Sequence, residues 1–336
     1  MLATIWVFVG LAMVLVPVWV GLTRWSVILN GHPATLVVTI ACGLAGIVAL
    51  AWAIATLLLG ERFDTELASG EPKRTEPERR RRARWRLGLA VPALLVCLLT
   101  TSLLAWSRPY PASEVALSAM RSANEVRVAD RLTWFELQST RKDRAGRTVK
   151  ATTGLIFYPG ARVDSRAYAH LLRPLASAGY LVVVVKEPFG LGLINSNAAE
   201  RVLEVHPEIT RWAVGGHSLG GVAASSFADS HAPRVQALVL YAAYPAGKLS
   251  RTDLKVLSVS GSADGLATPD KVAASRPDLP ARAQFVVVKG GVHAFFGDYG
   301  PQQGDGTPRV SRAAAQSQIV RATKTLLASL TPPAKK

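Results

Sequence analysis

The sequence contains very little cysteine. Cys42 and Cys97 are the only two among its 336 residues, and residues 108–336 contain none. A disulfide framework and a cysteine-ligated metal site are therefore excluded from that part of the chain. This composition is compatible with an exported domain.

Charge is absent from three long apolar stretches near the N-terminus. These are residues 2–22, 34–60 and 87–107. An α-helix needs about 20 apolar residues to cross the hydrocarbon core of a bilayer, and each stretch supplies them. Uncharged stretches of this length favour membrane spans over buried core helices. We therefore predict a membrane region, residues 1–107, with three transmembrane helices.

The loops between these stretches differ in positive charge. Residues 61–86 contain nine Lys or Arg, six of them within Arg79–Arg86, whereas residues 23–33 contain only Arg24. The positive-inside rule then places the 61–86 loop and the N-terminus in the cytoplasm, and everything after Ser107 outside. Anionic lipid headgroups are the expected partners of Arg79–Arg86, which directly precede the third span.

The third stretch, unlike the first, resembles a signal peptide. No Lys or Arg precedes the first stretch, which argues against a cleaved signal peptide there. The third stretch follows a basic segment and ends in Ala105-Trp106-Ser107, so cleavage after Ser107 would release a soluble domain. Retention as a membrane anchor is the interpretation we favour.

Negative charge is scarce after residue 107. Residues 108–336 contain 29 Lys or Arg and 17 Asp or Glu, so their net charge is 29 − 17 = +12. Such a surface favours anionic surroundings, for example phospholipid or acidic polymers. No helix-turn-helix, zinc or aromatic RNA-binding pattern accompanies the charge, so nucleic acid is not an expected partner.

Beyond a linker, residues 108–130, short apolar segments alternate with helical patterns. The expected strands are 132–139, 148–153, 155–158, 181–185, 212–215, 235–241, 255–260 and 285–289, and the expected helices are 165–178, 219–229, 268–275 and 310–330. Asp164 or Ser165 can cap the first of these helices. The alternation predicts one α/β domain, residues 131–332, with a doubly wound and mostly parallel sheet.

One motif within this domain suggests a nucleophile. Gly216-His217-Ser218-Leu219-Gly220 has the form G-x-S-x-G and stands between an apolar strand and an Ala-rich helix. In that setting glycines permit a tight turn, and the serine hydroxyl projects over the ends of the parallel strands. The start of the following helix offers N–H groups where negative charge would develop. Ser218 is therefore the candidate nucleophile.

A nucleophilic serine needs a base and an acid that orients the base. Beyond Ser218 the chain has two histidines, and His231 is at the far end of the helix that leaves the motif. His293 follows a strand by a short glycine turn, and Asp264 follows the preceding strand. The order Ser218, Asp264, His293 matches a nucleophile-acid-base arrangement on a parallel sheet.

The same arrangement needs two N–H donors for an oxyanion. One is expected from Leu219, directly after the nucleophile, and the other from Gly160 or Ala161, in the loop after strand 155–158. Residues 187–193 follow a strand at the same edge and could form a wall of the site. Only about a dozen residues separate the strands 235–241 and 255–260, so no large lid is expected over Ser218.

The segments "GLIFYPGARVD", "GGHSLGG", "GSADG" and "GGVHAFFGDYG" together resemble the α/β-hydrolase superfamily. The resemblance is greatest to its small dienelactone-hydrolase-like bacterial members and covers about residues 130–330. It implies an α/β-hydrolase fold after three transmembrane helices, with Ser218, Asp264 and His293 as triad and no cofactor or metal. Dienelactone hydrolases commonly use a cysteine nucleophile, so their substrate does not transfer to this chain.

The sequence therefore predicts a membrane-anchored serine hydrolase whose domain faces outward. A carboxylic ester, small or lipid, is the expected substrate, cleaved through an acyl-enzyme. Acyl transfer, or cleavage of an amide or thioester, is an alternative on the same fold. A non-catalytic binding protein on a hydrolase scaffold is a third interpretation.

Overall fold

The computed structural model describes residues 2–66, 76–123 and 125–330. The chain divides into two compact units. The first consists of Met1–Leu29 and Ala34–Arg108, and the second of Asn30–Pro33 and Pro109–Lys336.

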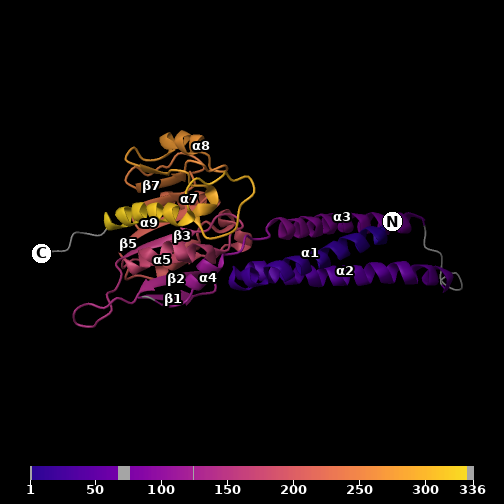
Figure 1. Cartoon of the computed structure of the whole chain (residues 1–336). Helices are drawn as coiled ribbons and strands as arrows, with labels where there is room; N and C mark the ends of the chain where they lie inside the picture. The colour runs from indigo at the N-terminus through magenta and orange to yellow at the C-terminus, as the bar shows by residue number, and fades with distance from the viewer. Residues whose placement is uncertain (1, 67–75, 124, 331–336) are drawn as a thin grey trace. The chain divides into compact units, whose positions relative to one another are not determined.

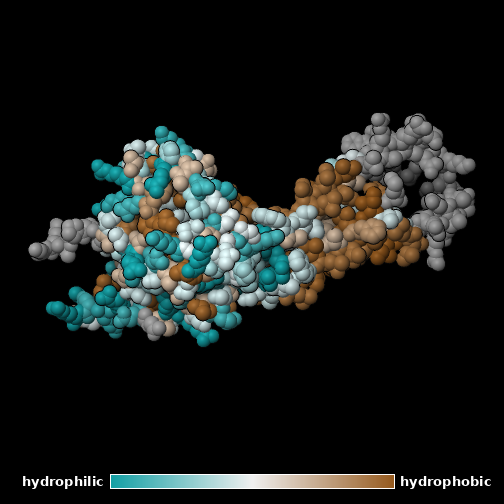
Figure 2. Space-filling model, turned by 45° about the horizontal axis from the view of Figure 1, so that its top comes forward, coloured by the Kyte–Doolittle hydropathy of each residue, from teal (hydrophilic) through white to brown (hydrophobic). Residues whose placement is uncertain are grey.

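Three long helices make up the first unit (Figure 1). They are α1 (Leu2–Asn30), α2 (Pro33–Glu66) and α3 (Glu76–Trp106). Leu2–Asn30, Pro33–Leu58 and Gly88–Trp106 are each long and apolar enough to cross a membrane. Apolar side chains cover most of the coloured surface of this unit in Figure 2. The side chains of Arg79–Arg86 lie outside the described residues, so their contact with lipid stays a prediction.

Small residues allow α1 and α2 to approach closely. A Cβ atom on Gly10 would lie 2.9 Å from the Leu50 nitrogen, and one on Gly46 would lie 2.7 Å from Cβ of Met13. Close backbone approach through small residues is the common way for helices to pack in a membrane, where burying apolar surface gives no advantage over lipid. The Cys42 thiol lies 3.7 Å from the Thr101 hydroxyl and links α2 to α3.

The described residues of the second unit form an eight-stranded sheet in the order β1-β2-β4-β3-β5-β6-β7-β8. The strands are β1 (Val126–Asp130), β2 (Trp134–Ser139), β3 (Thr153–Tyr158), β4 (Leu181–Val185), β5 (Arg211–His217), β6 (Ala237–Tyr241), β7 (Lys255–Gly261) and β8 (Gln284–Val288). All pairs from β4 to β8 are parallel, and β1 and β2 are antiparallel to their neighbours. The predicted mostly parallel sheet is thus confirmed. We call the edge at which the parallel strands end the carboxyl edge.

Helices cover both faces of the sheet (Figure 1). Helices α4 (Glu114–Ala119), α5 (Ala169–Ser177) and α9 (Arg312–Ala328) share one core, and α6 (Ala198–Val205) and α7 (Leu219–Ser230) share the other. The short α8 (Pro269–Ala274) lies against β7. Successive β3 side chains alternate between the cores, with Phe157 in the first and Ile156 and Tyr158 in the second. Both faces are apolar, because both are covered.

Two segments differ from the sequence prediction. The strand predicted at 148–153 is wrong, since β3 begins at Thr153 and the preceding residues contribute only an isolated bridge between Lys142 and Thr148. The predicted linker, residues 108–130, contains α4 and β1, and β1 pairs with β2. Both elements are short, and their periodicity is too brief to identify them from the sequence.

Candidate active site

The chain turns sharply between β5 and α7. Ser218 occupies the turn with φ 52° and ψ −125°, a conformation that a non-glycine residue rarely adopts. Its N–H donates to the Tyr241 carbonyl (2.9 Å) and so ties the turn to the end of β6. The Ser218 side chain is half-buried, and it stands at the carboxyl edge as the motif predicted.

The glycines of the motif are required by packing. A Cβ atom on Gly216 would collide with the backbone of Gly220, and one on Gly220 would collide with the Pro159 carbonyl. The β3–β5 register, which pairs Tyr158 with Gly216, brings the loop after β3 alongside the turn. Any side chain at these positions would push apart the elements that hold Ser218.

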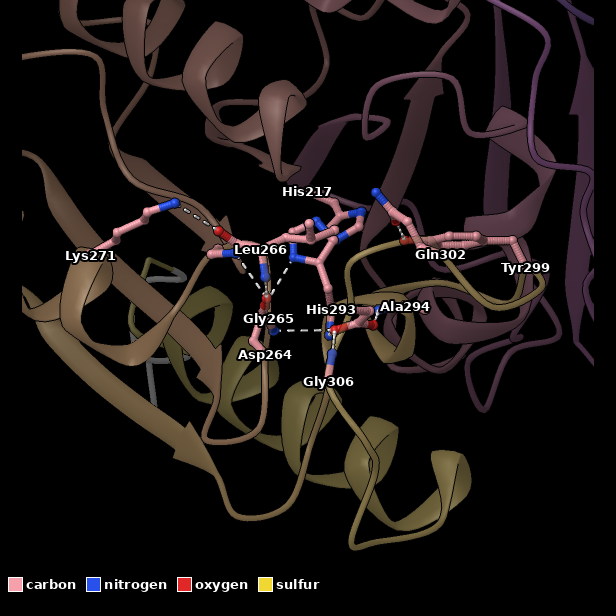
Figure 3. Close-up of polar contacts among 12 residues, drawn as sticks. His217, Asp264, Gly265, Leu266, Lys271, His293, Ala294, Tyr299, Gln302 and Gly306 are labelled. Carbon is pink, nitrogen blue, oxygen red and sulfur yellow. Dashed lines mark hydrogen bonds and ion pairs between the residues drawn. The ribbon is translucent and has the colours of Figure 1, made fainter.

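Asp264 and His293 meet at the same edge (Figure 3). The Nδ1 of His293 lies 2.9 Å from Oδ2 of Asp264, and both residues are buried. The other carboxylate oxygen accepts the N–H groups of Leu266 and Ala267, both at 2.8 Å. The carboxylate is thus fixed by its own loop, and one oxygen remains to orient the imidazole. The predicted pairing of these two residues is present.

The remaining nitrogen of His293 is available for chemistry. Its Nε2 is buried and has no hydrogen-bond partner among the described residues, so the bond to Ser218 is not formed in this structure. Catalytic hydrogen bonds are often long without substrate and tighten when it binds. The ring of His217, next to Ser218 in the chain, lies 4.5 Å from the His293 ring, which places the serine turn beside the base.

His217 supports the site without acting as its base. It is fully buried, and its Nδ1 lies 2.9 Å from the Tyr168 hydroxyl. Burial, and to a lesser extent the neighbouring His293, hold the pKa of His217 well below its usual value. Burial also raises the pKa of Tyr168, so its hydroxyl keeps its proton and can donate to His217. The two groups thus form a neutral support beneath His293.

This network bears on the oxyanion donors. The Gly160 N–H donates to the Tyr168 hydroxyl (2.8 Å) and is not free for a ligand in this structure. Ala161, the other predicted candidate in this loop, is half-exposed. Leu219 is the first residue of α7, where N–H groups have no acceptor within the helix. The geometry therefore favours Ala161 over Gly160 as the partner of Leu219.

Comparison with protein families agrees with this architecture. Residues 154–317 match the model described as the alpha/beta hydrolase family. The second unit has the alpha/beta hydrolase fold. The matched residues include Ser218, Asp264 and His293 and exclude the three helices that are long and apolar enough to cross a membrane. The resemblance found in the sequence is confirmed at this level.

Several solved structures that are similar to this chain are described as hydrolases, and their sequences are distant. A Klebsiella pneumoniae protein described as a dienelactone hydrolase is 17% identical, with a TM-score of 0.41, over 56% of this chain and 89% of its own. An alpha/beta hydrolase enzyme from a Medee basin deep-sea metagenome library is 20% identical, with a TM-score of 0.40, over 52% and 86%. Mouse alpha/beta hydrolase domain-containing protein 10 is 12% identical, with a TM-score of 0.41, over 62% and 100%. No curated protein sequence matches the chain.

Asp305 of the hydrolase domain joins the histidine loop to the acid loop, and the sequence did not reveal it. Its Oδ1 accepts the N–H groups of His293 (2.9 Å) and Gly265 (3.3 Å), and its Oδ2 accepts that of Ala294 (2.8 Å). A single carboxylate therefore fixes the backbone on both sides of the Asp264–His293 pair. The segment that contains Asp305 carries no pattern that would distinguish it from a polar loop.

Glu187 is a buried acid at the end of β4. The side chain is 6% exposed, and neither carboxylate oxygen has a hydrogen-bond partner among the described residues. Burial raises the pKa of Glu187 to about 8. The segment that begins here was predicted to form a wall of the site, but this carboxyl is buried within the hydrolase domain.

We predict that Asp305→Ala lowers kcat/KM for an ester roughly 10- to 100-fold, because small displacements of a base have costs of this size. The measurement is steady-state hydrolysis of a short-chain aryl ester. Asp270→Ala, which removes an exposed carboxylate on α8, is the matched control and should retain activity. Equal activities of the two variants would contradict the role assigned to Asp305.

We predict that the buried Glu187 carboxyl makes the stability of the hydrolase domain depend on pH. The folded protein keeps the Glu187 proton up to about pH 8, whereas the unfolded chain loses it near its ordinary pKa, so stability falls as pH rises between these values. Glu187→Gln removes this dependence. The free energy of unfolding of the variant minus that of the parent should therefore increase by about 4 kcal/mol from roughly pH 5 to pH 8. Thermal unfolding followed across this range tests the slope, and parallel curves would disprove it.

Proposed function

We propose that the domain is a serine hydrolase that cleaves carboxylic esters through an acyl-enzyme. The observation that carries the proposal is the strained Ser218 turn beside a buried His293–Asp264 pair, at one edge of an alpha/beta hydrolase sheet. A nucleophile, a base and an orienting acid are the three parts that such chemistry requires. The roles that follow are those predicted from the sequence.

In the first half of the reaction Ser218 Oγ attacks the ester carbonyl carbon. His293 Nε2 takes the hydroxyl proton, and Asp264 stabilises the imidazolium through Nδ1–H. The carbonyl oxygen becomes an oxyanion that accepts the N–H groups of Leu219 and Ala161. When the tetrahedral intermediate collapses, His293 returns the proton to the departing alcohol, and Ser218 carries the acyl group as an ester.

Water completes the cycle in the second half. His293 takes a proton from water, the hydroxide attacks the acyl carbonyl, and a second tetrahedral intermediate forms. Its collapse releases the carboxylic acid and returns the proton to Ser218. The β6–β7 connection, residues 242–254, is too short to form a large lid over the half-buried Ser218, which supports the access of water to the acyl-enzyme.

The proposal extends to the location of the substrate. The nine Lys or Arg in residues 61–86 favour a cytoplasmic location for this loop. Because one span, Gly88–Trp106, separates the loop from the hydrolase domain, the domain would lie on the opposite side of the membrane. The domain would then act on an ester outside the cytoplasm, anchored by its three helices.

We predict that Ser218→Ala abolishes covalent labelling by a fluorophosphonate probe and lowers aryl-ester hydrolysis at least about 10³-fold. Ser226→Ala changes an exposed serine two turns further along α7 and should keep both signals. Far-UV circular dichroism verifies that each variant is folded. Labelling of Ser218→Ala at the parent level would remove Ser218 as the nucleophile.

Sidedness is tested by cysteine labelling in intact cells. In a chain whose two cysteines are replaced by alanine, Arg144→Cys should react with a membrane-impermeant maleimide, because Arg144 lies in an exposed loop of the domain. Ser69→Cys, in the loop between the second and third spans, should react only after the cells are lysed. The reverse pattern would invert the topology.

A further inference from the structure

The segment that follows the third span is bound directly to the candidate active site. We call residues 109–113 the entry strap. The N–H of Tyr110 donates to the Arg162 carbonyl (2.6 Å), and the Tyr110 carbonyl accepts the N–H of Asp164 (2.9 Å). These bonds lie immediately after Ala161 in the loop that follows β3. The strap is therefore paired with the loop that carries a candidate oxyanion donor.

The far end of the strap is bound to the loop after His293. Ala112 forms an antiparallel bridge with Tyr299, and the N–H of Ser113 donates to the Asp298 carbonyl (2.8 Å). The aromatic rings of Tyr110 and Tyr299 also pack at 5.9 Å. The chain thus enters the hydrolase domain at its carboxyl edge, between two loops of the site.

The length of the chain limits how far this edge can lie from the membrane. The apolar stretch of α3 ends at Trp106, only four residues before Tyr110. Four extended residues span at most about 14 Å. Tryptophan is typical of the interface between lipid and water, and Trp106 is half-exposed. The strap, and with it the loops that it pairs with, therefore begins within about 14 Å of the end of the apolar stretch of α3, whatever the orientation of the two units.

Exposed apolar side chains gather at the same edge. Among the described residues 109–330, the large apolar side chains that are exposed are Val115, Leu132, Val149, Leu193, Ile194, Val205 and Val287. Four of these seven lie at the carboxyl edge: Val115 just after the strap, Leu132 in the turn beside the end of β4, and Leu193 and Ile194 after β4. We call these four the apolar rim.

Leu193 and Ile194 follow a glycine that lies beside the motif of the candidate nucleophile. They belong to the 3-10 turn Gly192–Asn195, and a Cβ atom on Gly192 would lie 3.8 Å from Gly220 Cα, in the motif of Ser218. The two side chains are 52% and 56% exposed. Val149 and Val205, in contrast, precede β3 and β5 and lie at the opposite edge of the sheet.

We propose that the apolar rim docks on the bilayer that α3 spans, and that the enzyme takes its ester substrate directly from this bilayer. The substrate is then an amphiphile with an acyl chain embedded in lipid. The docking rests on the strap and the rim, and the substrate class rests in addition on the proposed esterase function. Because the anchor already supplies a high local concentration of membrane, a few apolar side chains suffice to orient the domain.

The positive charge of the hydrolase domain is consistent with docking on a bilayer. The chain after residue 107 carries a net charge of +12, and the exposed Arg131 directly precedes Leu132 in the rim. Basic side chains beside apolar ones are typical of surfaces that bind anionic lipid headgroups. A protein partner would fit the apolar rim as well, but the three anchoring helices keep the domain permanently next to a membrane.

The docking is tested on the full chain in proteoliposomes, with Cys42 and Cys97 replaced by alanine. An environment-sensitive fluorophore is attached at Leu193→Cys or, as the matched control, at Val149→Cys. Lipids with a quencher in their acyl chains should reduce the emission at least threefold at residue 193 and less than 1.3-fold at residue 149. Equal quenching at the two positions would overturn the docking, whether or not the protein is an esterase.

The substrate class is tested by the ratio of two rates in the same vesicles. Diacylglycerol in the bilayer is the lipid ester, and a short-chain aryl ester is the soluble one. The pair Leu193→Gln and Ile194→Gln should lower the ratio of lipid to soluble rates at least fivefold, whereas Val149→Gln with Val205→Gln should leave it unchanged. An unchanged ratio in the rim variant would disprove delivery from the bilayer. If the parent chain hydrolysed neither ester, the esterase function itself would be disproved.

Discussion

The close approach of β3, β5 and α7 is the constraint on which the site depends. The Ser218 turn exists only because Gly216 and Gly220 leave space for backbone to touch backbone. The same contact places the loop after β3 next to the start of α7. A nucleophile, two possible oxyanion donors and a helix N-terminus thus follow from one steric condition, which a single Cβ atom would remove.

The histidines show how the site separates support from chemistry. His217 is buried on Tyr168 and remains neutral because its pKa is low, so it adds no charge beside His293. His293 has its Nδ1 fixed by Asp264, which in turn is held by backbone N–H groups of its own loop. Both rings are buried, and the Nε2 of each has no hydrogen-bond partner among the described residues. Their Nδ1 partners differ, a neutral hydroxyl for His217 and a carboxylate for His293, and this difference favours His293 as the base.

Much of this arrangement could be predicted because it depends on local order along the chain. The apolar strands, the G-x-S-x-G turn and the position of Asp264 and His293 after successive strands are visible in the sequence. The supporting residues were not, since Asp305 contacts Gly265 and Tyr168 contacts His217, and the members of each pair lie 40 or more positions apart in the chain. The strand assigned to 148–153 failed because an apolar-polar alternation over a few residues also fits an irregular loop. Residues 108–130, in contrast, do contain a helix and a strand that the sequence did not predict. Both elements are too short to give a clear periodicity, and the domain around them stabilises them.

That misassigned linker changes how the anchor and the site are related. A flexible tether would leave the hydrolase domain free to turn any edge toward the membrane. The entry strap instead is paired on both sides, with Arg162 and Asp164 in one loop and with Asp298 and Tyr299 in the other. Few residues remain to rotate between Trp106 and Tyr110. No large insertion follows β6 to cover Ser218, since only residues 242–254 connect β6 to β7. Under the proposed docking, the direction in which the site faces would therefore take the place of a lid in selecting the substrate.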